Sequence, residues 1–100
     1  MFIHHVYFWL KPGSPDTVRD QLVSDCKAYL GDLPGVHHLW AGAPAMTPRD
    51  VVDNSYDVGL CVILKDAAAH DVYQTHAQHI EFIARNKASW ERVRVYDFHG

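Results

Sequence analysis

The chain has 100 residues, of which 48% are hydrophobic, and a formal net charge of −3 with the histidines neutral. This length predicts one compact domain over residues 1–100, and the hydrophobic content excludes a disordered chain. Lysines and arginines are scattered along the sequence, which argues against a nucleic-acid partner, and no apolar run is long enough to span a membrane.

The first ten residues are apolar, but they lack the basic start and the small-residue cleavage site of a signal peptide. Their aromatic and β-branched side chains instead predict a strand over residues 2–10. The two cysteines, Cys26 and Cys61, show no CxxC spacing, so we interpret them as reduced residues of the core. Together these features predict a cytoplasmic protein.

A helix is predicted after this strand. Ser14 can cap it, and Pro15 suits its first position. Apolar side chains then recur every three to four residues, which gives one buried stripe. The stripe consists of Val18, Leu22, Cys26, Tyr29 and Leu30. Gly31 is expected to end the helix just after its last turn.

The rest of the chain alternates between strand and helix patterns. Residues 36–43 and 56–64 are predicted as strands, and residues 44–55, which include two prolines, as a surface loop between them. Asp66 occupies the position of a helix cap, so a second helical region is expected to follow it. Residues 91–98 form the last predicted strand.

The resulting order, β-α-β-β-α-β, is that of an α+β ferredoxin-like fold. Two helices can cover only one face of a four-stranded sheet, yet both faces of the strands are apolar. We assign five residues to the uncovered face: Val6, Phe8, Leu10, Cys61 and Ile63. An exposed apolar face of this width normally marks an interface. We therefore expect a homodimer in which two sheets pack face to face, as in a dimeric α+β barrel.

A carboxylate stands out in the last strand, where Asp97 continues the apolar row of Val93 and Val95. Burying a carboxylate without a partner would cost several kcal/mol, on the order of the penalty for an isolated charge. Either the end of the strand is exposed to water, or Asp97 pairs with a histidine. Such a pair would fix the tautomer of the ring and raise its basicity.

Histidines and aromatic residues gather in the segment HDVYQTHAQHIEF, residues 70–82. Tyr73, His76 and His79 follow one another at intervals of three, so a continuous helix places them on one side. His70 has no such neighbours, and we assign it to solvent. Some of the aromatic side chains in this segment can equally be ordinary core residues.

The first strand adds His5, which shares a face with Tyr7 and Trp9. A lone histidine on an apolar face is more often a core residue than a catalyst. Metal binding is an alternative, because HAQH offers two ligands and His5 or Asp97 could add a third. No CxxC or HExxH motif accompanies them, so we predict neither a metal site nor a cofactor.

Four segments resemble the stress-responsive A/B barrel (Dabb) family, whose members are dimeric α+β barrels. The segments are HHVYFWLK, LPGVHHLWAG, VYQTHAQH and VRVYDF, and together they extend over nearly the whole chain. The Y-x-x-H-x-x-H run is the most specific of them. Ala77 departs from the family pattern, because many members have proline after the first histidine of this run.

Among the characterised catalysts of the family, the chain most resembles olivetolic acid cyclase, a plant polyketide cyclase. This resemblance implies that Tyr73 and His79 are catalytic, that His5 is a pocket histidine, and that Asp97 supports His79. In such a site His79 takes a proton from a carbon beside a carbonyl, and Tyr73 donates a hydrogen bond to the carbonyl oxygen. The resemblance also makes Trp90 a pocket aromatic residue.

The expected ligand is a small apolar molecule with a carbonyl group, and the proposed chemistry requires no cofactor. The other residues expected to line its pocket are Tyr7, Trp9, Leu22, Leu60, His76, Phe82, Val93 and Val95. Two alternatives to such an enzyme stay open at this point. One is a protein that binds a small ligand or serves a stress response without catalysis, and the other is a cofactor-free oxygenase or a haem-binding barrel.

Overall fold

The computed structural model describes residues 1–100. The elements are β1 (Phe2–Leu10), α1 (Asp16–Asp25), a π-helical turn (Cys26–Leu30), β2 (Val36–Gly42), β3 (Val58–Leu64), α2 (Ala67–Thr75), α3 (Ala77–Asn86), a 3-10 turn (Lys87–Ser89) and β4 (Trp90–His99). The strands pair antiparallel in the order β2-β3-β1-β4. This topology confirms the predicted α+β ferredoxin-like fold, with the second helical region divided into two helices.

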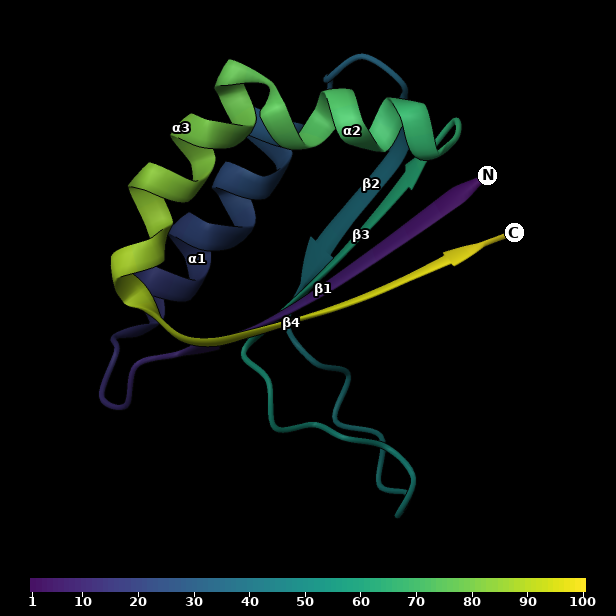
Figure 1. Ribbon diagram of the computed structural model, residues 1–100. Coiled ribbons are helices and arrows are strands. Elements are labelled where there is room, and N and C mark those ends of the chain that lie inside the picture. The colour runs from purple at the N-terminus through teal and green to yellow at the C-terminus, as the bar shows by residue number, and fades with distance from the viewer.

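The helices cover one face of the sheet, as Figure 1 shows, with α1 and α3 side by side and α2 near one end. The loop between β2 and β3 extends past the opposite end, and the two chain termini lie next to each other on β1 and β4. Thirteen buried apolar side chains form one cluster, to which the sheet and the helices both contribute. None of the helices combines the length and the apolar composition that crossing a bilayer requires.

The two faces of β1 differ in burial. Val6, Phe8 and Leu10 are buried under the helices, so their assignment to the uncovered face was wrong. The register pairs Val6 with Leu60 and His5 with Cys61. Cys61 therefore lies on the uncovered face, as predicted, but with His5 as its neighbour. Both faces of the strand are apolar, so alternation alone could not indicate which one the helices cover.

The start of α1 differs from the prediction, whereas the start of α2 agrees with it. Pro15 precedes the first helical residue, and the hydroxyl of Ser14 donates to the carbonyl of Lys11 at 2.6 Å instead of capping the helix. At α2, an Asp66 carboxylate oxygen accepts from the backbone N–H of Ala69 at 2.8 Å. This contact satisfies one of the free amides of the first turn, as a helix cap does.

A break at His76 separates α2 from α3. The backbone of His76 is extended, with φ −64° and ψ 142°, and its Nδ1 accepts from the N–H of Gln78 at 3.1 Å. The chain thus turns here without a proline at position 77, because the imidazole caps the new helix. His76 does not line the cavity described below. Its predicted place in the pocket is therefore wrong.

Candidate functional site

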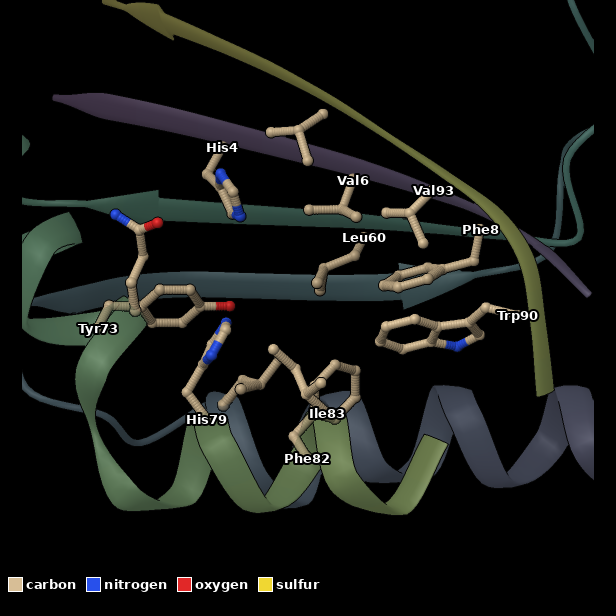
Figure 2. Close-up of a pocket in the computed structure, with 13 residues that line it drawn as sticks. His4, Val6, Phe8, Leu60, Tyr73, His79, Phe82, Ile83, Trp90 and Val93 are labelled. Atoms are coloured by element: carbon tan, nitrogen blue, oxygen red, sulfur yellow. The ribbon is translucent and has the colours of Figure 1, made fainter. Parts of the chain in front are cut away.

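A cavity of about 190 Å³ lies between the sheet and the helices. Its walls are mainly apolar and come from Val6, Phe8, Leu30, Leu60, Phe82, Ile83, Trp90, Val93 and Val95. Four polar side chains also reach it, namely His4, Tyr73, Gln74 and His79. Figure 2 shows His4, Tyr73 and His79 at the cavity. Val93 and Val95 on β4 are 40% and 45% exposed, so the cavity opens along this edge strand. Apolar walls around a few polar groups are typical of small-molecule sites.

Asp97 forms a hydrogen bond with His4, which lies directly opposite it in the register of β1 and β4. The His4 Nδ1 and an Asp97 carboxylate oxygen are 2.6 Å apart. An ionised carboxylate can only accept, so Nδ1 donates and the lone pair of the neutral ring resides on Nε2. The His4 side chain is 10% exposed and that of Asp97 34%. Asp97 is thus partly exposed to water and also paired with a histidine, so each of the two alternatives holds in part, and the partner is His4.

Tyr73 brings a phenol into the cavity from α2. Its residue exposure is 1%, and its hydroxyl has no hydrogen-bond partner in the protein. Burial raises the pKa of Tyr73 above the ordinary phenol value, and Cys26 adds to this effect. The hydroxyl therefore keeps its proton at neutral pH and can donate it to a ligand in a hydrogen bond.

His79, on α3, is the second imidazole of the cavity. Its ring meets that of Tyr73 edge to face, with the ring centroids 4.8 Å apart. Its Nδ1 is buried and has no protein partner. Burial lowers the pKa of His79 below the ordinary imidazole value, and the nearby His4 and His70 lower it further. The neutral ring is thus favoured, and it can exchange hydrogen bonds with a ligand.

His70 is buried, so its assignment to solvent was wrong. Its ring stacks on Phe2 with centroids 4.3 Å apart and lies 4.7 Å from the ring of His4. Burial lowers the pKa of His70, as does the neighbouring His4, whereas Asp97 and Asp71 oppose this effect. On α2 it precedes Tyr73 by three residues, so both side chains turn toward the sheet.

Three residues predicted for the pocket lie instead on the other face of the sheet. His5 packs between Tyr7 and Phe98, with ring centroids 6.3 and 5.8 Å away. Tyr7 and Trp9 lie on the same face, near Tyr56. Their prediction as pocket residues was wrong for the same reason as the assignment of Val6 to the uncovered face. In both cases the two alternating rows of side chains on β1 were assigned to the wrong faces of the sheet.

The remaining predicted residues divide into two groups. Leu22 is buried in the core but does not line the cavity, which corrects its predicted place. The cavity does include the predicted Leu60, Phe82, Trp90, Val93 and Val95. The prediction that Asp97 supports His79 was wrong, since the carboxylate reaches across the sheet to the adjacent strand.

Sequence reasoning missed His4 and His70 as members of the site. For His4 a signal was present, because it shares a row with Val6 and Phe8, just as Asp97 shares one with Val93 and Val95. If the strand of His4 is placed antiparallel beside the strand of Asp97, with their apolar rows on the same face, His4 and Asp97 become neighbours. For His70 the position three residues before Tyr73 gave a similar signal.

Among solved structures, the fold is similar to a Dabb family protein with a ferredoxin-like fold from Mesorhizobium loti. The identity is 26% and the TM-score 0.80, over 99% of this chain and 95% of that one. A dimeric ferredoxin-like protein of unknown function from Thermobifida fusca matches with 15% identity and a TM-score of 0.83, over 99% and 90% of the two chains.

A hydroxynitrile lyase from Passiflora edulis also shares the fold, with 14% identity and a TM-score of 0.79, over 97% of this chain and 90% of that one. No curated protein matches the sequence. The family model described as the stress responsive A/B barrel domain, Dabb, matches residues 2–99. The chain therefore belongs to the stress-responsive A/B barrel (Dabb) domain family.

Proposed function

We propose that this protein is an enzyme that removes a proton from a carbon next to a carbonyl group of a small apolar substrate. The observation that carries this proposal is the 2.6 Å hydrogen bond between His4 and Asp97 at an apolar cavity. The same cavity is lined by Tyr73 and His79, each of which has a buried polar atom with no partner in the protein. A bound carbonyl compound would supply those partners.

In the proposed reaction His4 is the general base. Its Nε2 accepts the proton from carbon, and its Nδ1–H donates to Asp97, which stabilises the imidazolium that forms. Asp97 is a positioning residue, because it acts on the substrate through His4. A histidine held in one tautomer by a carboxylate is a common arrangement for this task.

Tyr73 is the proposed donor to the substrate's carbonyl oxygen. Negative charge develops on that oxygen as the enolate forms, and a donor already in place stabilises it. The raised pKa of Tyr73 keeps the phenol protonated for this purpose. The neutral ring of His79 offers a second contact to the substrate, next to Tyr73. The enolate can then attack a second carbonyl of the same molecule, as in polyketide cyclisation, or expel a leaving group, as in a lyase reaction.

The cavity favours a compact substrate. Its volume of about 190 Å³ is below the roughly 300–1,000 Å³ of typical ligand pockets. The shared fold of the Passiflora edulis hydroxynitrile lyase is compatible with lyase chemistry in a domain of this shape. A larger substrate would extend along β4, where the cavity opens.

We also propose that the working form is a homodimer in which the uncovered sheet faces pack together. This face is lined by aromatic and apolar side chains from all four strands, namely Ile3, Tyr7, Trp9, Trp40, Cys61, Ile63, Tyr96 and Phe98. Neighbouring structures from Thermobifida fusca, Bacteroides fragilis and Jannaschia are described as dimeric. Burial of such a face would remove a wide apolar surface from water.

The test of the enzyme proposal follows proton exchange at carbon, which requires no knowledge of the natural product. Small methyl ketones and 1,3-diketones are incubated with the protein in D₂O, and deuterium incorporation is followed by NMR. We expect His4→Gln to lower the exchange rate about 10²–10⁴-fold, as loss of a general base does. Tyr73→Phe should lower it about 10²–10³-fold, as loss of an oxyanion donor does. His37→Gln, at an exposed position on β2, is the matched control.

Exchange that is equal in wild type and both site variants would refute the proposed roles. A second candidate function is binding without catalysis, and the unpaired polar atoms of Tyr73 and His79 favour it equally. It predicts that the same carbonyl compounds raise the melting temperature of the wild type while no deuterium enters them. The two measurements on one sample therefore distinguish the candidates.

A further inference from the structure

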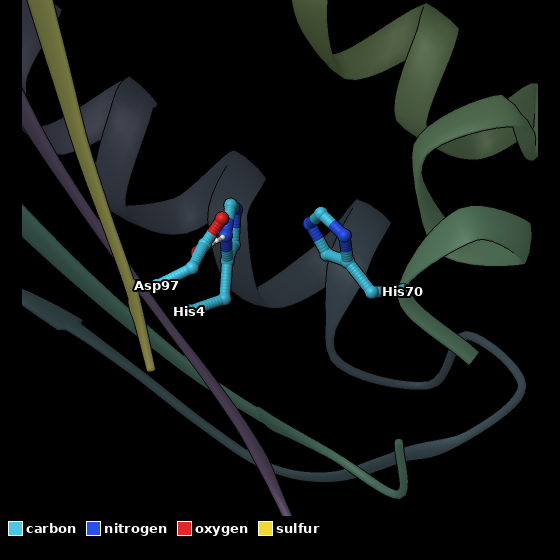
Figure 3. A group of neighbouring side chains, drawn as sticks. All are labelled: His4, His70 and Asp97. Carbon is cyan, nitrogen blue, oxygen red and sulfur yellow. Dashed lines mark hydrogen bonds and ion pairs between the residues drawn. The ribbon is translucent and has the colours of Figure 1, made fainter. Parts of the chain in front are cut away.

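We propose that His4, His70 and Asp97 form a binding site for a divalent transition-metal ion of the zinc type. Each of the three side chains offers one ligand atom, and these atoms all lie within 4.8 Å of one another. Figure 3 shows Asp97 and His4 side by side on the sheet, with His70 facing them from the helical layer. The residues come from β1, α2 and β4, so the tertiary fold creates this group.

The donor set determines which ion would bind. Two imidazoles and one carboxylate suit zinc and similar transition ions, whereas magnesium and calcium prefer oxygen ligands. Ligands of a tetrahedral zinc ion at roughly 2.0–2.1 Å lie about 3.3 Å apart. Small side-chain rotations can bring the three donors from their present spacing to that geometry. The remaining coordination position would be open to water or a ligand.

Two of the three proposed ligands, His4 and Asp97, are in contact on the sheet. They are register partners on adjacent strands, with Nδ1 and the carboxylate oxygen 2.6 Å apart. With Asp97 ionised, the proton of this hydrogen bond belongs to Nδ1. In the loaded site the cation takes the place of this proton, and the neutral His4 ring carries its own proton on Nε2. The exposed part of the Asp97 side chain gives the ion a path from solvent.

His70 supplies the observation that points to a missing ligand. Its Nε2 is buried and has no hydrogen-bond partner in the protein, although the ring is held firmly against Phe2. Its other nitrogen, Nδ1, lies 3.2 Å from the amide nitrogen Nε2 of Gln74. A rotation of the Gln74 amide by about 180° would exchange this nitrogen for the oxygen. In the metal-loaded site the oxygen would then accept from Nδ1–H of His70, and Nε2 of His70 would present a lone pair to the ion. Outer partners of this kind orient metal-bound histidines.

This inference does not rest on the proposed enzyme function, because it uses only the placement of three side chains. The two uses of His4 are alternatives, since Nε2 cannot accept a proton while it carries one. Metal binding is therefore measured directly, with no substrate present, and its failure would leave the carbonyl chemistry untouched.

The experiment titrates untagged protein, first treated with a chelator, with zinc chloride in a calorimeter, and with magnesium chloride in parallel. We expect one equivalent of zinc per chain and no binding of magnesium. Cobalt(II) in place of zinc should give the visible absorption bands of a protein-bound four- or five-coordinate ion. His70→Ala and Asp97→Asn should each weaken zinc binding at least about 10-fold, because each removes a ligand.

His37→Ala removes an exposed imidazole on β2 and should leave the affinity unchanged. If His70→Ala does not fold by circular dichroism, His70→Phe replaces it and keeps the ring stacked on Phe2. Failure of the wild type to bind zinc would overturn the proposal. So would several weak equivalents that persist in the His70 and Asp97 variants, because these would indicate adventitious binding to surface histidines.

Discussion

The rings of Tyr73 and His79 meet edge to face at 4.8 Å, although the helix break at His76 lies between them in the chain. On a single straight helix, six residues correspond to about 600° of rotation, so the two side chains would point about 120° apart. The extended backbone of His76 resets the direction, so that α2 and α3 turn one ring each into the same cavity. The helix break therefore brings the side chains of Tyr73 and His79 together.

The isolated hydroxyl of Tyr73 leads to a prediction that separates function from stability. A buried hydroxyl without a partner costs about 1–3 kcal/mol, so Tyr73→Phe should leave the free energy of unfolding unchanged or raise it by about 1 kcal/mol. Tyr73→Ala, which removes the ring, should lower it by about 3–5 kcal/mol. Urea denaturation of the three proteins provides the measurement. A clear loss of stability in the Phe variant would mean that the hydroxyl has a partner after all.

The two buried histidines of the helical layer predict how stability depends on pH. Burial lowers the pKa of both His70 and His79, so the folded state resists protonation that the unfolded chain accepts. The free energy of unfolding should therefore have its full value above about pH 6.5, the pKa of a histidine in the unfolded chain. It should fall with decreasing pH toward the lowered folded values, by at most about 1.4 kcal/mol per pH unit for each histidine.

Urea denaturation at several pH values between about 7.5 and 5.5 measures this slope. His70→Phe and His79→Phe should each flatten the curve, because each removes one of the protons that the unfolded state takes up in excess. His37→Ala, which changes an exposed position, is the control and should follow the wild-type curve. Equal slopes in all four proteins would contradict the assignment of the pH effect to these two rings.

The fold could be predicted because local signals were independent and agreed with one another. Aromatic and β-branched runs, the Asp66 cap and the stripe containing Leu22 and Leu30 each marked one element, and together they fit one topology. The helix break could not be derived in this way, since Ala77 is a good helix former. It depends on His76, whose side chain caps the following helix.

The candidate site was harder to predict, because it depends on which face of the sheet the helices cover. Both faces of β1 are apolar, and a shift of one residue exchanges His4 for His5. The sequence indicated that the carboxylate of Asp97 could pair with a histidine. Whether that histidine lies on a helix, as His79 does, or on the neighbouring strand, as His4 does, depends on the register of the strands. Only the pairing of β1 with β4 places His4 opposite Asp97.

A partly buried network around Asp25 predicts where the helical layer is most sensitive to mutation. Asp25, at the end of α1, accepts from Arg85 Nε at 2.9 Å and from the Asn86 amide, also at 2.9 Å. Asp25→Ala removes an acceptor of the buried Asn86 amide, whereas the exposed Arg85 guanidinium can bind water instead, so we expect a loss of about 1–3 kcal/mol. Asp20→Ala, on the exposed side of the same helix, should change stability by less than about 0.5 kcal/mol. Thermal and urea denaturation of both variants would reveal the contrast, and equal effects would show that the network does not join the two helices.

The proposed dimer predicts unequal effects from two equally exposed apolar residues. Phe98 on the uncovered sheet face is 53% exposed, and Val72 on the outer side of α2 is 51% exposed. An aspartate at position 98 would introduce a charge between the packed sheets, so Phe98→Asp should weaken association by at least about 2 kcal/mol, or roughly 30-fold in Kd. Val72→Asp should leave association unchanged, because the helical layer faces solvent. Light scattering coupled to size-exclusion chromatography gives the mass of each species over a range of concentrations. Monomeric wild type, or a Phe98 variant that dimerises as well as the Val72 variant, would place the interface elsewhere or remove it.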